Sequence, residues 1–254
     1  MRLDSWPRPC IFAHRGASAY APENTLAAFE LALQQGAPAI ELDVKLSADG
    51  HVVVIHDPTV DRTTNGKGKV ARLSLSELRA LDAGSFFSEK YRGEKIPTLE
   101  EVFDLVGKRA LINIELTNYT TPRDSLVEEV CRLVREHRME ENVLFSSFLP
   151  RNLHQAAILL PEVPRGLLAL EGWKGLWMRS FQFFFGNYQA LHPYVSDVTP
   201  QQIASVHRIG RRVHVWTVND ANQMRRLLKW GADGIFTDDP PLALQIAAEF
   251  RGAS

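Results

Sequence analysis

The sequence predicts an α/β fold, namely a (β/α)8 TIM barrel with a small inserted subdomain after the second barrel strand. Short β-rich runs alternate with helical runs almost to the C-terminus, and eight of these runs can serve as core strands. Eight strands with intervening helices favour a closed barrel over an open sheet. The length of 254 residues is also typical of an α/β barrel folded as one unit. We therefore expect one barrel domain over residues 1–254.

The expected strands are short apolar runs bounded by glycine, proline or polar residues. The eight core strands are Ile11–His14, Ala39–Lys45, Ala110–Leu116, Val143–Ser146, Arg165–Ala169, Tyr194–Val198, Arg212–Val218 and Gly234–Thr237. A further strand, Val52–His56, is expected to pair with the second core strand as a hairpin.

The expected helices carry start and stop signals at their ends. They are Thr25–Gln35, Leu99–Val106, Asp124–His137, Pro150–Leu160, Pro200–Ile209, Ala221–Trp230 and Pro241–Arg251. Asn24 is the expected N-cap of the first helix, and Pro200 lies in the first turn of a later one. Gly36, Gly210 and Gly231 are expected to end helices.

Two segments interrupt this alternation. Residues 57–98 are rich in Gly, Ser, Thr and charged residues and are too long for an ordinary loop, so we expect the inserted subdomain there. Residues 171–192 are unusually aromatic and include Trp173, Trp177, Phe181, Phe183, Phe184 and Phe185. This second segment is either the fifth barrel helix with an aromatic face packed in the core or part of an apolar wall for the substrate.

The bulk composition excludes several classes of function. Lys plus Arg number 29 and Asp plus Glu number 30, so no overall field attracts nucleic acid or anionic lipid. The sequence has no apolar run of about 18 residues, and its first residues lack the apolar region of a cleaved signal peptide. Cys10 and Cys131 are too few for a disulfide framework and fit a reducing compartment. We expect a soluble, cytoplasmic protein with a small-molecule substrate, no nucleic-acid partner and no stable membrane insertion; no feature indicates an oligomeric state.

Residues 41–57 place two carboxylates and an imidazole in one hairpin. The Asp-Gly pair at 49–50 is a strong signal for a two-residue turn, which sets Asp43 opposite His56. Glu41 and Asp43 are two residues apart on a strand, so both project from the same face. We therefore expect Glu41, Asp43 and His56 to share one pocket.

Further polar residues fall at the C-terminal ends of neighbouring strands, where TIM barrels carry their active sites. His14 and Arg15 close the first core strand. Asn113, Glu115 and Thr117 alternate along the third and can face one side. These residues are expected to join the hairpin residues in the same pocket.

The three carboxylates Glu41, Asp43 and Glu115 predict a divalent cation, Mg²⁺ or Ca²⁺. Both ions prefer oxygen ligands, and neither a cysteine nor a dense histidine set accompanies these carboxylates. Without a cation, their like charges would raise one another's pKa and disfavour folding. The alternative interpretation is that each carboxylate pairs with a nearby Lys or Arg.

His14 and His56 suit proton transfer, because an imidazole with an ordinary pKa of about 6.5 can accept or donate a proton near neutral pH. Arg15 offers a planar fork for a phosphate, and the glycine after it allows close approach. The alternative for Arg15 is a salt bridge at the end of the barrel. The histidines interpreted as packed or hydrogen-bonded residues without a catalytic role are His51, His137, His154 and His207.

These residues are part of a longer, ordered series of motifs. The series is His14-Arg15-Gly16-Ala17, Pro22-Glu23-Asn24-Thr25, Glu41-Leu42-Asp43-Val44, His56-Asp57, Asn113-Ile114-Glu115, Ser146-Ser147-Phe148, Val215-Trp216-Thr217-Val218-Asn219 and Gly231-Ala232-Asp233-Gly234-Ile235-Phe236-Thr237-Asp238-Asp239-Pro240. It spans nearly the whole chain and resembles the glycerophosphodiester phosphodiesterase family.

The resemblance implies a TIM barrel with a subdomain inserted after His56 and a divalent-metal-dependent phosphodiesterase. The roles that it implies are acid–base catalysis for His14 and His56, metal ligation for Glu41, Asp43 and Glu115, and phosphate binding for Arg15.

It also implies supporting roles for other motif residues. Trp216 would form a wall of the substrate site, or else pack in the barrel core. Asp57 and Asp238 are expected to orient neighbouring residues or cap loops. Glu23 and Asn24 are expected to be structural.

The sequence departs from the family pattern at one position. Members of the family commonly carry a lysine two residues beyond the third carboxylate, and Thr117 stands there in this chain. A threonine can hydrogen-bond a phosphate oxygen but cannot neutralise it. Lys45, two residues beyond Asp43, is a candidate to supply the charge instead.

The expected function is metal-dependent hydrolysis of glycerophosphodiesters, such as glycerophosphocholine or glycerophosphoethanolamine, to sn-glycerol 3-phosphate and an alcohol. Two alternatives stay open. The aromatic segment motivates a lysophospholipase D-type activity on lysophospholipids. Thr117 motivates a barrel that binds a phosphodiester or metal without turnover.

Overall fold

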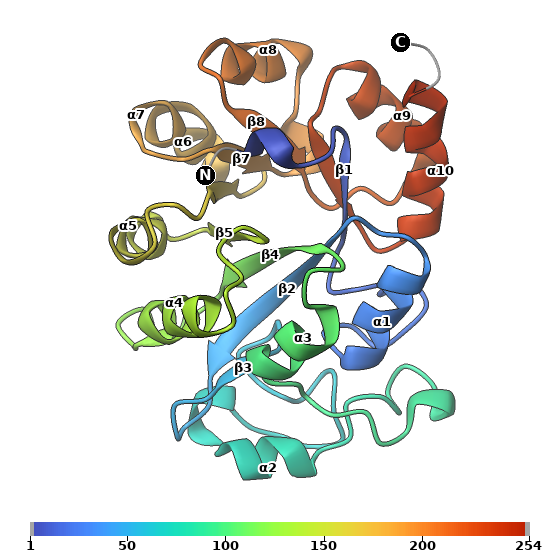
Figure 1. Ribbon diagram of the computed structural model, residues 1–254, viewed down its shortest axis with the longest axis vertical. Coiled ribbons are helices and arrows are strands. Elements are labelled where there is room, and N and C mark those ends of the chain that lie inside the picture. Colours follow the sequence, from blue (N-terminus) through green and yellow to red (C-terminus); the bar gives the residue numbers. More distant parts are fainter. Residues whose placement is uncertain (1–2, 252–254) are drawn as a thin grey trace.

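A closed barrel of parallel strands forms the centre of the computed structural model, which describes residues 3–251 (Figure 1). The barrel strands are β1 (Cys10–Ala13), β2 (Ala39–Leu46), β4 (Leu111–Leu116), β5 (Val143–Ser147), β6 (Arg165–Ala169), β7 (Ala190–Pro193), β8 (Arg212–Val215) and β9 (Gly234–Thr237). Because β1 pairs with both β9 and β2, the sheet closes on itself. The predicted (β/α)8 TIM barrel is confirmed, although residues 1–2 and 252–254 of the expected domain lie outside the described residues.

Helices surround the barrel, and all but one of them bury its outer face. They are α1 (Leu26–Gln34), α2 (Leu75–Ala80), α3 (Leu99–Val106), α4 (Leu126–Glu136), α5 (Pro150–Leu159), α6 (Trp173–Trp177), α7 (Phe183–Phe185), α8 (Pro200–Arg208), α9 (Ala221–Lys229) and α10 (Pro240–Arg251). The exception is α2, which lies beside the barrel. The main apolar core lies between strands and helices and includes Ile40, Ile112 and Phe145. A smaller cluster, with Trp6, Phe12 and Phe236, lies beside it.

The first helix begins one residue later than expected. Thr25 is its N-cap, and its side-chain oxygen accepts a hydrogen bond from the Ala28 N–H. Asn24 instead has a left-handed backbone, with φ of 58°, and its side chain donates to Asp43. The expectation that Asn24 caps the helix was therefore wrong, because the nearby carboxylate takes its amide.

One predicted core strand was misplaced by four residues. The strand is Ala190–Pro193, whereas residues 195–197 of the predicted Tyr194–Val198 form a short 3₁₀ turn. Asp197, the last residue of this turn, joins it to the segment around α6, since its carboxylate accepts from the Gly172 N–H and pairs with Arg179. These tertiary contacts thus decide the conformation of residues 195–197, although their valine-rich sequence predicts a strand.

The hairpin β2–β3 has a longer turn than predicted. The strand β3 is Val52–Val54, antiparallel to β2, and the turn spans 48–50 with Gly50 at φ of 85°. Asp43 consequently lies opposite Ile55, whose N–H donates to the Asp43 carbonyl, and not opposite His56. A three-residue turn with a left-handed glycine is a common hairpin connection and shifts the register by one.

Residues 57–98 form a small unit beside the barrel, as expected. They contain α2, which begins at a capping box made by Ser74 and Glu77. Their own apolar cluster includes Val60, Leu78 and Ile96 and packs under β3. In Figure 1 this unit lies at the bottom of the view, below β3.

The aromatic segment is helical, but most of its rings face solvent. A π-helical turn, Met178–Gln182, joins α6 to α7. Phe183 is fully buried, whereas Trp173 and Phe185 are 82% and 78% exposed. The expectation of an aromatic face packed in the core was therefore wrong for most of these rings.

Within residues 3–251, no helix is long and apolar enough to cross a lipid bilayer.

Candidate active site

A cavity of about 280 Å³ opens at the C-terminal ends of the barrel strands. Its lining residues come from most of these strands and the loops that follow them: His14, Arg15, Glu41, His56, Asn113, Glu115, Ser146, Phe148, Leu168, Leu170, His192, Trp216, Thr217 and Phe236. Its volume suits a small ligand. The cavity therefore gathers both predicted histidines, Arg15 and two of the three predicted carboxylates.

His14 is held by a carboxylate from the last barrel strand. Its Nδ1 lies 2.6 Å from Oδ1 of Asp238, which follows β9. Ser18 and Asn219 also donate to this carboxylate, at 3.0 and 2.6 Å. Burial opposes its charge, but the hydrogen bond from His14 and its neighbours lowers the pKa of Asp238 to about 2. A carboxylate at Nδ1 leaves Nε2 of His14 to face the cavity, 4.0 Å from Glu41.

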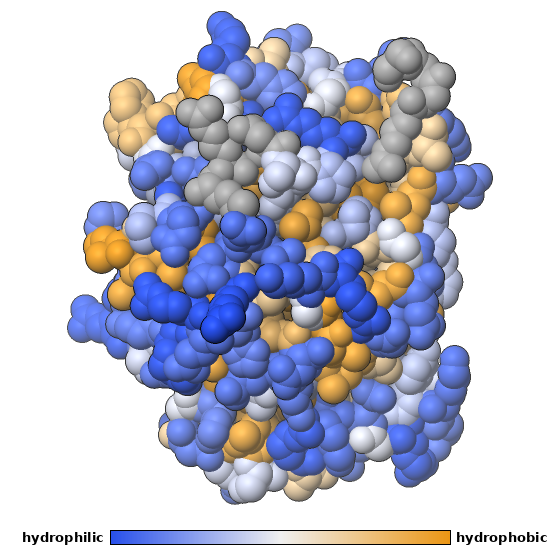
Figure 2. Space-filling view, viewed as in Figure 1, coloured by the Kyte–Doolittle hydropathy of each residue, from blue (hydrophilic) through white to orange (hydrophobic). Residues whose placement is uncertain are grey.

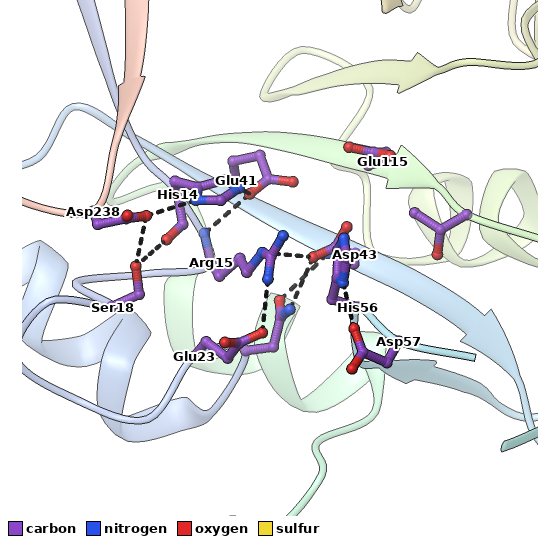
Figure 3. A network of polar contacts seen from close by, with 12 residues as sticks. His14, Arg15, Ser18, Glu23, Glu41, Asp43, His56, Asp57, Glu115 and Asp238 are labelled. Carbon is purple, nitrogen blue, oxygen red and sulfur yellow. Dashed lines mark hydrogen bonds and ion pairs between the residues drawn. The ribbon is translucent and has the colours of Figure 1, made fainter. Parts of the chain in front are cut away.

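His56 is held in the same way from the opposite side of the cavity. Its Nδ1 lies 2.7 Å from Oδ1 of Asp57. Hydrogen bonds from Arg62 and then from His56 lower the pKa of Asp57 to about 2, so this carboxylate is charged at neutral pH. The expectation that Asp57 and Asp238 orient neighbouring residues is confirmed, and each orients a histidine (Figure 3).

The three predicted metal ligands converge. One oxygen of each of Glu41, Asp43 and Glu115 lies within 4.8 Å of the others. Glu41 and Asp43 are buried on β2, and Glu115 is half-buried beside Asp43 on β4. Three hard oxygen donors at this spacing fit a divalent cation such as Mg²⁺ or Ca²⁺.

Burial and neighbouring charges shift the pKa values of the three carboxylates in the absence of a cation. Burial and the charges of Asp43 and Glu115 raise the pKa of Glu41 well above its ordinary value. Burial and Asp43 raise the pKa of Glu115 to about 8. The pKa of Asp43 is lowered, because Arg15 and His56 outweigh its burial. Like charges therefore keep protons on part of the cluster, which is the behaviour of a site that lacks positive charge.

Arg15 connects the carboxylates to the rim of the cavity. Its backbone N–H donates to Glu41 at 3.0 Å, and its guanidinium contacts Glu23 at 2.8 Å and Asp43 at 3.4 Å (Figure 3). These anions raise its pKa against the effect of burial. The salt-bridge interpretation of Arg15 is thus correct, and its place in the cavity lining also leaves it available to a phosphate.

The glycine that follows Arg15 is required by the fold. Arg15 and Gly16 both have left-handed backbones, with φ of 57° and 85°. A Cβ on Gly16 would lie 2.7 Å from atoms of Ala28 in α1, closer than side chains approach in proteins. Gly16 therefore permits the approach of α1, whereas the sequence analysis assigned this role to an approaching phosphate.

Lys45 and Thr117 form one unit. The ammonium of Lys45 donates to both the carbonyl and the hydroxyl oxygen of Thr117, each at 2.8 Å. The hydroxyl of Thr117 in turn donates to the carbonyl of Val44. The charge of Lys45 therefore lies against Thr117, although neither residue is in the cavity lining.

Arg62 from the inserted unit links the two halves of the site. Its guanidinium donates to Glu23 at 2.7 and 2.8 Å and to Asp57 at 2.7 Å. Glu23 holds Arg15, and Asp57 holds His56. No motif in the sequence indicated Arg62, because its contacts join residues far apart in the chain.

Arg62→Gln is expected to lower kcat/KM by about tenfold, since small displacements of catalytic groups have effects of this order. The thermal unfolding midpoint is expected to change little, because half-exposed ion pairs contribute little to stability. Arg225→Gln is the control, as Arg225 forms a similar double contact with Glu249 away from the site. An activity loss equal to that of the control would show that Arg62 does not position the site.

Trp216 lines the cavity and is half-buried. Its Nε1 donates to the carbonyl of His192 at 2.8 Å, and its ring packs edge-on against Phe148 and Tyr194. His192, which the sequence analysis also missed, contacts His214 at 3.2 Å. Burial lowers the pKa of His192 to about 3, so this imidazole is neutral.

The remaining histidines lie outside the cavity lining. His51 and His154 are exposed, whereas they were expected to be packed or hydrogen-bonded. His207 bonds Asp233 at 2.7 Å, and His137 packs on Phe103. None of the aromatic residues of α6 and α7 lines the cavity, so the expectation of a substrate wall from this segment was also wrong.

Comparisons with known proteins agree on one family. The model of the glycerophosphoryl diester phosphodiesterase family matches residues 14–242. A glycerophosphodiester phosphodiesterase of Caldanaerobacter subterraneus subsp. tengcongensis is 41% identical over 237 residues, which cover 93% of this chain and 96% of the relative. The structure of an Oleispira antarctica phosphodiesterase in complex with the product sn-glycerol-3-phosphate has a TM-score of 0.89 and 33% identity, covering 98% of this chain and all of that one. A Silicibacter pomeroyi structure described as a glycerophosphoryl diester phosphodiesterase has a TM-score of 0.84 and 28% identity over 98% of this chain and 97% of its own.

Proposed function

The chain belongs to the glycerophosphoryl diester phosphodiesterase family, and we propose that it hydrolyses glycerophosphodiesters to sn-glycerol 3-phosphate and an alcohol with a divalent cation and two histidines. It is a phosphoric diester hydrolase by family. The observation that carries the finer proposal is that two carboxylate-held histidines face one cavity that is also lined by Glu41 and Glu115 of the three-carboxylate cluster. The product bound by the Oleispira antarctica relative supports a glycerophosphodiester as substrate.

The proposed mechanism assigns one proton to each histidine. As the attacking oxygen forms its bond to phosphorus, Nε2 of one histidine accepts its proton. As the bond between phosphorus and the leaving oxygen breaks, Nε2 of the other histidine donates a proton to the alkoxide. Asp238 and Asp57 hold the two rings and stabilise whichever imidazole is charged.

Charge on the phosphoryl group is balanced by two parts of the site. Arg15 lies in the cavity lining, where its guanidinium can bind a phosphate oxygen. Glu41, Asp43 and Glu115 would hold the divalent cation. When bound, the cation supplies charge stabilisation to the phosphoryl oxygens. Trp216 forms the wall of the cavity against which the substrate lies.

The proposal is tested by incubating the protein with glycerophosphocholine and either Mg²⁺ or Ca²⁺. We expect sn-glycerol 3-phosphate and choline in equal amounts, and we expect EDTA to abolish the reaction. Turnover that persists after EDTA treatment and dialysis contradicts the metal requirement. Absence of product with glycerophosphocholine and glycerophosphoethanolamine alike contradicts the substrate assignment.

A second candidate substrate is a lysophospholipid, which carries one acyl chain on the same glycerophosphodiester core. The apolar part of the cavity lining favours it. Leu170 and Phe148 line the cavity, and Leu170 is 45% exposed at its mouth. Relative rates on glycerophosphocholine and lysophosphatidylcholine separate the two substrates. We expect the soluble diester to be the faster one, because the cavity is too small to enclose an acyl chain.

A further inference from the structure

The outer face of the helical segment 173–185 carries large apolar rings that the rest of the described chain leaves uncovered. Trp173, Trp177, Phe181 and Phe185 are 82%, 58%, 49% and 78% exposed. They follow one another at intervals of four residues, so they share one helix face. Apolar side chains protrude at the edge of the molecule where α7 lies (Figure 2). We call these four residues the aromatic face.

The aromatic face is ordered and supported from behind. The rings of Trp177 and Phe181 stack with centroids 4.6 Å apart, and those of Phe181 and Phe185 lie 4.4 Å apart. Phe183 anchors the segment in the core. Arg179 donates to the carbonyl of Gly172 at 2.8 Å and pairs with Asp197. The exposed rings therefore form a continuous strip on a fixed helix.

The charge around the aromatic face is mostly positive, with one exposed carboxylate, Glu171, two residues before Trp173. Residues 172–196 contain no Asp or Glu, and neither does α5, the neighbouring helix. A groove between α5 and α7 is lined by Arg151 and by the exposed Ile158. Lys174 is exposed beside Trp173. Because the charge of Arg179 is paired with Asp197, Lys174 and Arg151 are the cations that border the strip.

The aromatic face is also joined to the cavity. Leu170, which ends the strand that leads into the segment, lines the cavity and is exposed at its mouth. Only Glu171 and Gly172 separate Leu170 from Trp173. A surface bound along the strip therefore lies next to the opening through which substrate enters.

We infer that the aromatic face is a docking surface for a phospholipid bilayer with anionic headgroups. Trp and Phe on one helix face with Lys or Arg at its border are the residues that bind a helix in the plane of a membrane interface. The border carries the cations Lys174 and Arg151 and a single exposed carboxylate, Glu171, so its net positive charge complements anionic lipid. An apolar strip of this kind marks an interaction site. This inference rests on the proposed function and deepens it, because docking places the cavity mouth at the surface where lysophospholipids, which contain the glycerophosphodiester core, reside.

Cosedimentation of the full-length protein with large unilamellar vesicles tests the docking surface without any turnover. The vesicles contain equal parts phosphatidylcholine and phosphatidylglycerol, or phosphatidylcholine alone. We expect binding to the mixed vesicles that falls with added salt and is weaker on phosphatidylcholine alone. The triple variant Trp173→Gln/Trp177→Gln/Phe185→Gln is expected to lose at least about tenfold in vesicle affinity, because it removes most of the apolar area that enters the interface.

The matched control is Phe86→Gln/Ile209→Gln, which removes two exposed apolar side chains elsewhere. It is expected to bind as the unsubstituted protein does. Hydrolysis of glycerophosphocholine in vesicle-free buffer is expected to be unchanged in both variants, which shows that they are folded. Equal vesicle binding by the triple variant and the control overturns the inference, as does a lipid-free dimer that only the triple variant dissociates. The proposed function has a separate test. If the unsubstituted protein binds vesicles but does not turn over glycerophosphodiesters, the proposed function is contradicted and the docking surface is not.

Discussion

His56→Gln is expected to lower kcat on glycerophosphocholine by about 10²–10⁴-fold, the usual contribution of a positioned acid or base. His14→Gln is expected to have an effect of the same order. Each glutamine keeps a polar side chain of similar reach but cannot exchange a proton at neutral pH. Because Asp57 and Asp238 hold the rings from behind, their Asn variants are expected to lose activity to a smaller degree.

Steady-state kinetics of the two single variants and the double variant provide the test. Since the two histidines serve the same transition state, the double variant is expected to lose less than the product of the single losses. His51→Gln is the control, because His51 is exposed and lies before β3, outside the cavity lining. A His56→Gln variant that keeps more than half of the original kcat would remove His56 from the mechanism.

The sequence was sufficient to predict the barrel and the parts of the site that lie within single motifs. His14, Arg15, Glu41, Asp43 and Glu115 stand at the ends of neighbouring strands, and a parallel barrel brings such ends together. The positions of these residues in the sequence were therefore enough to predict that they lie close together in space. The hairpin error did not disturb this result, because a shift of one residue moved His56 beyond the strand but not away from the cavity.

Long-range contacts were the part that the sequence could not predict. Asp238 lies 224 residues from His14, and Arg62 joins Glu23 across 39 residues. Nothing in the local pattern distinguishes these side chains from other charged surface residues. Asp57 and Asp238 were both expected to orient neighbouring residues or cap loops, but the histidine that each one holds was not predicted.

Helical periodicity also leaves exposure undecided. The aromatic residues of 173–185 repeat at helical spacing, which indicated a core face, but Phe183 takes the buried position and the other rings point outward. The sequence also leaves undecided which residue places a positive charge beside Thr117. Lys45 was only a candidate, and the structure shows that it contacts Thr117 from the neighbouring strand.

Removal of the divalent cation is expected to abolish turnover and to make the protein sensitive to alkaline pH. The carboxyl of Glu115 has a pKa raised to about 8 by burial and by Asp43, above the ordinary value of 4.5. Between these two values the folded state binds a proton that the unfolded state has released. Stability of the metal-free protein therefore falls as pH rises from 5 to 8, by at most about 1.4 kcal/mol per pH unit for one such proton.

Bound cation is expected to reverse this trend, because it stabilises the ionised carboxylates that pH 8 favours. Thermal unfolding midpoints should fall from pH 5 to pH 8 in EDTA and should stay flat or rise with Mg²⁺ or Ca²⁺. Titration calorimetry at pH 7 in two buffers of different ionisation enthalpy should detect release of a proton on binding. Glu41→Gln and Glu115→Gln should weaken binding by about a hundredfold or more, since each removes a direct ligand and not merely its support. Glu249→Gln, which alters a surface ion pair, should leave affinity unchanged. Equal cation affinity in all three variants would place the ion elsewhere, whereas a midpoint in EDTA that rises from pH 5 to pH 8 would show that the three carboxylates do not share protons in the metal-free protein.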